Sequence, residues 1–350
     1  METFWFAVVV LMLSLYVMLD GFDFGTGIVY LAVSRTEEER RMVLQAIGPV
    51  WNGNEVWLIA SGGVIFFAFP KAYAAGFSGF YLALILVLWL LMVRGLALEL
   101  RSHFASPLWR QFWDTAFSGA SALLAFVFGV ALGNLIRGVP LDEEGFFHVP
   151  FWTTFTPDVA EPGIFDWFTI CMGLTAVAIL AHHGSAYLTM KTTGTVHRRA
   201  RKWADKSVWT VAGVSLAMTL TMVLVQPIIH DHYTARPWGA LLNGLALLGL
   251  GGMLYGRQTR KDGLAFAASC VLIVGMLGSS AWGLYPNILV SSTDPAFSLT
   301  VYNSAASPHG LAIGIQWFSV GCLLMVGYMI AMYRSFRGKI TSDMIGDGHY

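Results

Sequence analysis

The chain has 350 residues, of which 56% are hydrophobic and only 12% are charged. Soluble domains carry about 25% charged residues, so this composition argues against a soluble domain and indicates an integral membrane protein. The formal net charge of zero argues against a nucleic-acid-binding protein.

The first apolar run, Phe4–Val33, contains two aspartates, Asp20 and Asp23. The run is long enough to cross a bilayer, which takes about 20 apolar residues. No basic segment or small-residue cleavage site accompanies it, so we expect a retained helix and not a signal peptide. A carboxylate at membrane depth is costly, which makes both aspartates candidates for function.

Further apolar runs follow along the chain, and polar segments separate them. Runs of this length in lipid form helices, so we expect an all-α, single polytopic domain of about nine transmembrane helices. Their predicted ranges are 4–33, 47–69, 72–98, 115–136, 165–190, 207–229, 238–255, 263–285 and 311–333.

Lysine and arginine are distributed unequally between the loops on the two sides of these spans. If the N-terminus faces outward, the inward loops hold 17 of the 21 Lys and Arg residues and the outward loops hold three. Because cytoplasmic loops are enriched in these residues, we expect an N-out, C-in orientation. Two longer outward segments, 141–166 and 286–309, are predicted to form ordered caps.

Polar side chains enter the predicted membrane region mainly from the inward side. Asp20 and Asp23 are three residues apart and share a helix face, as do Asn52 and Glu55 at the inward start of the second span. Arg94 lies near the inward end of the third span. This one-sided distribution predicts a half-channel for protons that opens to the cytoplasm.

Structural explanations exist for several of these groups. Arg94 could neutralise Glu55, Glu99 or Asp23 as a buried ion pair. Glu99 and Arg101 are expected to extend to the membrane surface. Aromatic residues near span ends, such as Trp5 and Tyr333, are expected to belong to an interfacial belt.

His182 and His183 are the histidines at a depth suited to haem ligation. Adjacent helical residues point about 100° apart, so only one of them could face a given haem, and no second ligand is found at matching depth. The three cysteines lack metal-binding or haem-attachment spacing. We therefore expect this chain to ligate no haem or metal and to hold no catalytic residue.

Several motifs resemble subunit II of cytochrome bd-type quinol oxidases, and the resemblance extends over nearly the whole chain. These motifs are Gly21-Phe22-Asp23-Phe24-Gly25, the run GPVWNGNEVWL at 48–58, Phe77-Ser78-Gly79-Phe80-Tyr81, residues 186–192, Tyr285-Pro286 and Ser298-Leu299-Thr300.

The resemblance implies two four-helix bundles plus one peripheral helix, in the bacterial cytoplasmic (inner) membrane with a periplasmic N-terminus. It implies a haem-bearing subunit I as partner, often with a small single-helix third subunit, and contact with membrane lipid and quinone. Subunit I is expected to carry two b-type haems and one d-type haem. The complex would oxidise quinol and reduce dioxygen to water in aerobic respiration.

The resemblance also implies a cytoplasmic proton path through subunit II. Its two carboxylates map onto Asp23 and onto Asn52, where this sequence has an amide in place of the usual aspartate. An amide cannot accept a proton at neutral pH. We expect Glu55, one turn further on, to take the acid role; alternatively, the path does not depend on that position.

Two other functions fit parts of the sequence. Asp20, Asp23, Glu55 and Arg94 could form the midplane site of an ion-coupled secondary transporter. A self-contained b-type cytochrome would require His182 or His183 as ligand.

Overall fold

The structure is a computed structural model that describes residues 1–156 and 162–341, and most of these residues are helical. The elements in chain order are α1 Glu2–Val33, α2 Glu37–Ile47, α3 Trp51–Ala68, α4 Pro70–Gly79, α5 Tyr81–Leu100, α6 Pro107–Arg137, α7 Trp167–Lys191, α8 Gly194–Val225, α9 Pro227–Ala235, η1 Pro237–Gly239, α10 Ala240–Thr259, α11 Asp262–Leu284, β1 Asn287–Leu289, η2 Pro295–Phe297, β2 Leu299–Thr300 and α12 Pro308–Ser335.

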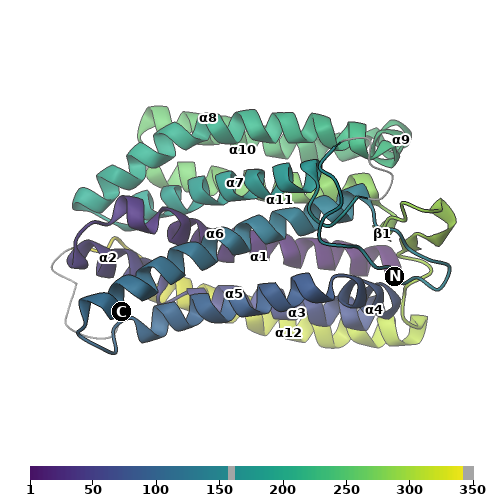
Figure 1. The fold of residues 1–350 in the computed structure, drawn as a ribbon, viewed down its shortest axis with the longest axis horizontal. Helices are drawn as coiled ribbons and strands as arrows, with labels where there is room; N and C mark the ends of the chain where they lie inside the picture. Colours follow the sequence, from purple (N-terminus) through teal and green to yellow (C-terminus); the bar gives the residue numbers. More distant parts are fainter. Residues whose placement is uncertain (157–161, 342–350) are drawn as a thin grey trace.

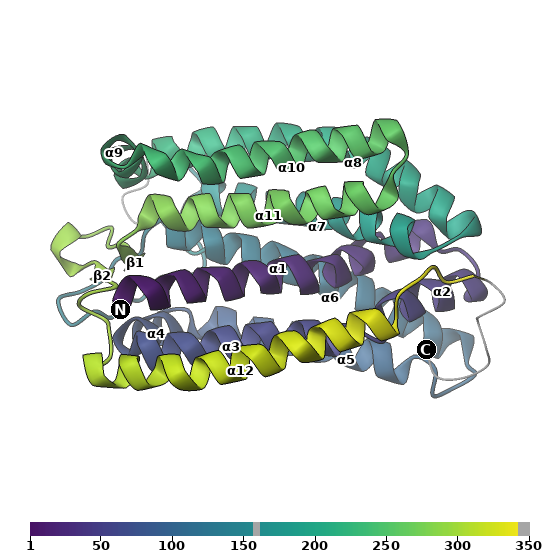
Figure 2. The same ribbon diagram turned by 180° about the vertical axis from the view of Figure 1, so that it is seen from behind.

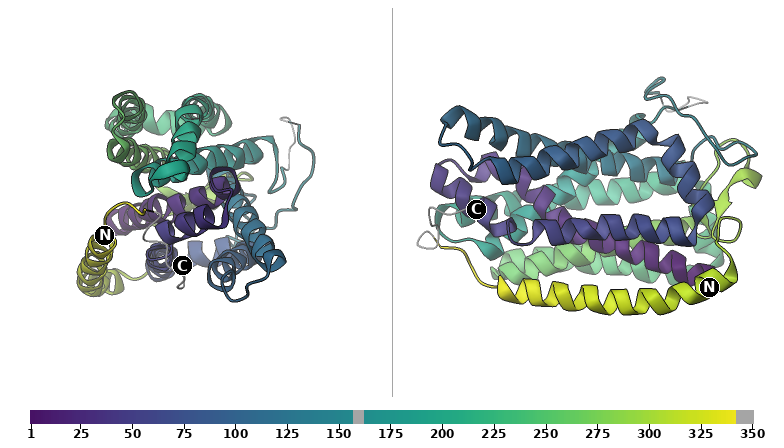
Figure 3. Two further views of the ribbon diagram at one scale, coloured as in Figure 1. Left: turned by 90° about the vertical axis from the view of Figure 1, so that its left-hand side faces the viewer. Right: turned by 90° about the horizontal axis from the view of Figure 1, so that it is seen from below.

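The long helices run side by side in stacked pairs (Figure 1). The pair α8 and α10 lies above α7 and α11, followed by α1 and α6, and then by α3 and α5. Helix α12 runs along the outside of the last layer, as the end-on view of Figure 3 shows. The predicted all-α membrane fold is confirmed. It consists of one four-helix group of α1, α3, α5 and α6, a second of α7, α8, α10 and α11, and the peripheral α12.

Eight helices of the described residues are long and apolar enough to cross a membrane. Helix α3 is not among them, because its first turns contain Asn52, Asn54 and Glu55. The count of nine spans therefore stays a prediction, as does their orientation.

The prediction of one continuous helix over 72–98 is wrong, because the chain forms two helices, α4 and α5, that meet at Phe80. A Cβ atom at Gly79 would lie 2.2 Å from Cζ of Phe147, so only glycine permits this contact at the break. The apolar run continues through the break, which is why the sequence did not reveal it.

Helix α8 begins at Gly194, 13 residues before the predicted start at 207, because its first turns are charged but still helical. The charged helix α2 likewise precedes the apolar part of α3. It begins with a capping box in which the Thr36 side chain accepts from the backbone N–H of Glu39.

The N-terminus lies at the same end of the molecule as α9 and the strand pair β1–β2 (Figure 2). Helix α2 and the end of α12 lie at the opposite end. The two predicted outward segments are both at the N-terminal end, and residues 157–161 of the first lie outside the described residues. We call the end with α2 the α2 end.

Candidate functional site

Helix α1 is buried on every side from Asp20 to Gly27. Glycine makes this possible, since a Cβ atom at Gly25 would lie 1.8 Å from the carbonyl oxygen of Leu180 on α7. The backbones of α1 and α7 therefore approach closely, as small residues allow between membrane helices. Asp20 and Asp23 are held in the centre of the molecule.

Asp20 forms a buried ion pair with Arg94 of α5. Arg94 Nη2 donates to Asp20 Oδ1 at 2.7 Å, and the two side chains are 1% and 0% exposed. Glu55 Oε2 lies 3.9 Å from the same nitrogen, and the guanidinium carbon lies 4.4 Å from the centre of the Phe24 ring. Of the three partners predicted for Arg94, Glu55 is confirmed, while the closest carboxylate is Asp20, which was not among them.

Asp23 is bound by an amide and has no ion-pair partner among the described residues. Asn54 of α3 donates from Nδ2 to Asp23 Oδ2 at 2.8 Å and to the carbonyl oxygen of Leu19 at 3.2 Å. Tyr333 of α12 donates its hydroxyl to Asn54 Oδ1 at 2.7 Å. These bonds form a chain from α12 to the buried carboxyl group of Asp23.

Two aromatic residues predicted to form an interfacial belt contact neighbouring helices. Trp5 is 1% exposed and donates to the carbonyl oxygen of Leu311, so its belt prediction is wrong. Tyr333 is half-buried and contacts Asn54, and its place in a belt stays a prediction. Sequence reasoning also missed Asn54, although it stands inside the motif that drew attention to Asn52 and Glu55.

Asn52 does not join the cluster. Its side chain is exposed on α3 and makes no hydrogen bond within residues 1–156 and 162–341, whereas Asn54 and Glu55 turn toward α1 and α5. The structure therefore brings together Asp20, Glu55 and Arg94, and places Asp23 beside Asn54.

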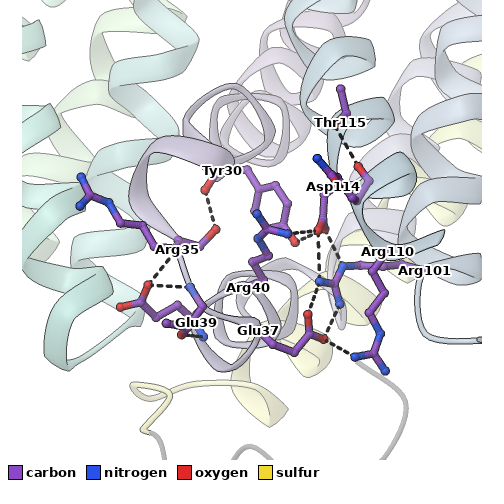
Figure 4. A network of polar contacts seen from close by, with 12 residues as sticks. Tyr30, Arg35, Glu37, Glu39, Arg40, Arg101, Arg110, Asp114 and Thr115 are labelled. Atoms are coloured by element: carbon purple, nitrogen blue, oxygen red, sulfur yellow. Dashed lines mark hydrogen bonds and ion pairs between the residues drawn. The ribbon is translucent and has the colours of Figure 1, made fainter. Parts of the chain in front are cut away.

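A second polar network lies at the α2 end (Figure 4). Asp114 of α6 is 1% exposed and accepts from Arg101, Arg40 and Tyr30 at 2.5–2.6 Å. Arg101 also donates to both carboxylate oxygens of Glu37. Arg101 is 2% exposed, so the prediction that it extends to the membrane surface is wrong. Carboxylates from α2 and α6 hold its guanidinium group inside.

Glu39 joins α2 to α8. Its carboxylate accepts from Thr195 and Arg199 of α8, each at 2.6 Å, and from the backbone N–H of Arg35. Burial alone would raise the pKa of Glu39, but these hydrogen bonds outweigh it and lower the pKa from 4.5 to about 2.

The two candidate haem ligands have other partners. In His183, Nδ1 lies 2.7 Å from Ser269 Oγ and Nε2 lies 2.9 Å from the carbonyl oxygen of Met18. In His182, Nδ1 lies 2.9 Å from Ser207 Oγ, and the residue lines a cavity of about 30 Å³. A cavity of this size is too small for a haem, and the described residues contain no His, Cys, Asp and Glu group suited to a metal ion.

Comparison with known proteins agrees with this fold. Residues 1–336 match the family model described as cytochrome bd terminal oxidase subunit II. The chain is 32% identical to cytochrome bd ubiquinol oxidase subunit 2 of Bacillus subtilis, with 96% of each chain covered. It is 30% identical to cytochrome bd-I ubiquinol oxidase subunit 2 of Escherichia coli K12, with 97% of this chain and 95% of the relative covered.

A solved structure has the same fold. The bd oxidase from Geobacillus thermodenitrificans matches with a TM-score of 0.75 at 19% identity, over 96% of this chain and 98% of the matched chain.

The long apolar helices, together with the bd oxidase relatives, indicate a multi-pass helical protein of the bacterial cytoplasmic membrane. More specifically, the chain belongs to the cytochrome bd terminal oxidase subunit II family, whose members are subunits of an oxidoreductase complex. A subunit II implies a subunit I as its partner.

Proposed function

We propose that this chain is the supporting subunit of a quinol-oxidising, dioxygen-reducing complex and that it contributes a proton-uptake path from the cytoplasm. In this proposal subunit I holds the two b-type haems and the d-type haem, and oxidises the quinol. The N-terminus is periplasmic, so the α2 end faces the cytoplasm.

The observation that carries the proton path is the position of the carboxylates along the helices. At 1.5 Å per residue, Asp23 lies about 15 Å from the end of α1, and Asp20 about 20 Å. Arg94 lies about 9 Å from the end of α5, and Glu55 about 6 Å from the start of α3. All four are in the half of their helices nearer the α2 end, and the contacts of Arg94 with Asp20 and Glu55 bring these three to the same depth.

Buried polar atoms of the cluster support a hydrated path. Within the described residues, Asp20 Oδ2, Asp23 Oδ1 and the Nε and Nη1 atoms of Arg94 are buried without a hydrogen-bond partner. Buried polar atoms are normally satisfied by protein or ordered water. We therefore expect ordered water between these groups, through which protons could pass.

The exposed face of α3 suggests where the proton path leaves this chain. Glu55 is 21% exposed at its side chain, and Asn52 is exposed beside it on the layer formed by α3, α5 and α12. An amide and a carboxylate facing lipid would be costly. We propose that this layer contacts subunit I, which would satisfy Asn52 and receive protons from Glu55.

The first test replaces Asp23 with Asn in the assembled complex. The amide keeps the shape of the side chain and its contact with Asn54 but removes the exchangeable proton. We expect oxygen consumption to fall at least about tenfold while assembly, measured as haem content per purified complex, changes little. Unchanged oxygen consumption in a fully assembled variant would contradict the proton path.

Glu55→Gln and Asn52→Asp test the division of roles within α3. If Glu55 replaces the aspartate missing at position 52, the Gln variant should lose oxygen consumption as Asp23→Asn does. Asn52→Asp should be tolerated, because its side chain is exposed toward the proposed partner. Full oxygen consumption in the assembled Gln variant would remove Glu55 from the path.

Ion-coupled uptake by the isolated chain in liposomes would favour the transporter hypothesis instead.

A further inference from the structure

A third polar region lies in the four-helix group of α7, α8, α10 and α11, away from the carboxylate cluster and from the network around Asp114. The inner ends of α7, α8, α10 and α11 surround the cavity of about 30 Å³ that His182 lines. Arg257, Arg260, Arg201, Asp205 and Asp262 line it. None of these residues takes part in the proposed proton path.

One of the residues that line the cavity is a buried, incompletely bonded histidine. His182 is 4% exposed, and its Nε2 has no hydrogen-bond partner among the described residues. A cavity of this size has room for one or two water molecules.

Positive charge exceeds negative charge around the opening. Asp205 is shared by Arg257 at 3.4 Å and Arg260 at 3.1 Å. Asp262 is shared by Arg201 and by Lys339, the latter at 3.7 Å. Four cations around two carboxylates leave an excess of two positive charges.

Two of the guanidinium groups keep donors available for a ligand. Arg260 is 61% exposed and donates one hydrogen bond, to Asp205. Arg257 donates no hydrogen bond within residues 1–156 and 162–341. Its guanidinium carbon lies 5.8 Å from the centre of the Trp209 ring. Arginine forks bind phosphate oxygens in pairs, which is the chemistry that both groups offer.

The surroundings select a lipid as the source of that phosphate. Trp209 of α8 and Tyr255 of α10 are 58% and 54% exposed, as expected of aromatic residues at a membrane surface. Further along the same helices, Leu216 and Leu248 are 62% and 72% exposed. An amphipathic molecule could place an anionic head on the arginines and its chains along α8 and α10.

We propose that Arg257 and Arg260 form a binding site for the phosphate of an acidic phospholipid in the inner leaflet. Basic pockets between membrane helices on the cytoplasmic side recognise such headgroups. The excess charge favours an acidic over a zwitterionic lipid, and the bound lipid ties α8 to the turn between α10 and α11.

The test uses the purified, delipidated complex, with phosphatidylglycerol or phosphatidylcholine added in mixed micelles. The thermal midpoint and the number of retained lipids, counted by native mass spectrometry, are the readouts. We expect phosphatidylglycerol alone to raise the midpoint. A similar rise with inorganic phosphate at the same concentration would identify a free-anion site and overturn the lipid assignment.

Substitutions then locate the site. Arg257→Gln with Arg260→Gln should weaken the response to phosphatidylglycerol at least about tenfold, as expected for two lost charge-assisted bonds. Lys202→Gln with Lys206→Gln removes the same charge from exposed positions of α8 and should keep the response. Equal losses in the two double variants would show only general charge attraction and overturn the proposal.

Asp205→Asn tests the site through a gain in the response to phosphatidylglycerol, and a weakened fold would not produce such a gain. This change releases both arginines from their carboxylate, so it should strengthen the response to phosphatidylglycerol several-fold. An unchanged or weaker response in an assembled Asp205→Asn complex would show that the arginines serve only to hold the helices together.

Discussion

At the scale of single residues, the side chain of Asn54 is held by three hydrogen bonds within the cluster. Its two amide donors bind Asp23 and the carbonyl oxygen of Leu19, and its oxygen accepts from Tyr333. Because the carbonyl oxygen of Leu19 can only accept, the amide nitrogen of Asn54 must face Leu19 and Asp23, and the amide oxygen accepts from Tyr333. Tyr333 therefore stabilises the orientation of Asn54 that Asp23 meets, although it does not touch the carboxyl group itself.

Tyr333→Phe tests this indirect role. The variant loses one hydrogen bond of about 1 kcal/mol, and the amide oxygen of Asn54 loses its partner, so the amide is held less firmly. If Asp23 carries protons, we expect oxygen consumption to fall several-fold and its pH profile to shift, with normal haem content in the complex.

Tyr328→Phe is the matched control for that measurement. It lies on the same helix and is 57% exposed, so the loss of its hydroxyl should leave both oxygen consumption and its pH profile unchanged. An unaltered pH profile in Tyr333→Phe would show that the hydroxyl group has no influence on Asp23.

At the scale of helices, the crossing of α1 and α7 sets where the cluster lies. A Cβ at Gly25 would meet the backbone of α7 at 1.8 Å, and a Cβ at Gly184 would meet the backbone of α1 at 2.1 Å. Two backbones cannot yield as a flexible side chain could. The helices would have to move apart, which would also displace Asp20 and Asp23.

We therefore expect Gly25→Ala to reduce the yield of assembled complex severely, or to lower its thermal midpoint by several degrees, since overpacking costs about 1–3 kcal/mol or more. Gly213→Ala on α8 is the control, because no atom lies within 4 Å of its added Cβ. That variant should assemble normally. A Gly25→Ala complex as stable as the Gly213→Ala complex would contradict the close packing.

At the scale of the whole molecule, α2 joins the two four-helix groups at the α2 end. Its Glu37 binds Arg101, which directly follows α5, and its Glu39 binds Thr195 and Arg199 of α8. The two groups are thus connected by charged contacts as well as by the packing of α1 and α6 against α7.

The lowered pKa of Glu39 makes one of these connections dependent on pH. Because its pKa is lower in the folded state, ionised Glu39 stabilises the fold above about pH 4.5, and this stabilisation is lost as the pH falls toward about 2. We expect the Glu39→Gln complex to have a lower thermal midpoint than the unchanged complex from pH 8 to about pH 5.

The difference between the two midpoints should narrow below about pH 4, because the Glu39 carboxylate of the unfolded chain takes up a proton there while that of the folded complex stays ionised down to about pH 2. Thermal midpoints measured across that range check the prediction. A difference that stays constant down to pH 3 would show that Glu39 acts through its shape and not through its charge.

The sequence alone determined the class and family of this protein. Long apolar runs can only be helices in lipid, and the motifs at 21–25 and 48–58 indicated a family that the comparisons confirmed. Asp20, Asp23, Glu55 and Arg94 were found for the same reason, since charged groups stand out in an apolar segment.

Only the tertiary structure decided how these residues are paired. The pairing of Arg94 with Asp20, the bond from Asn54 to Asp23 and the contact from Tyr333 each join residues that lie 31 to 279 positions apart. Phe147 packs against Gly79 beside the break at Phe80, and Asn52 is turned outward while Asn54 is turned inward by the packing of α3 on α1. Hydropathy reports how deep a residue lies in the membrane, whereas the direction of its side chain depends on which helices are its neighbours.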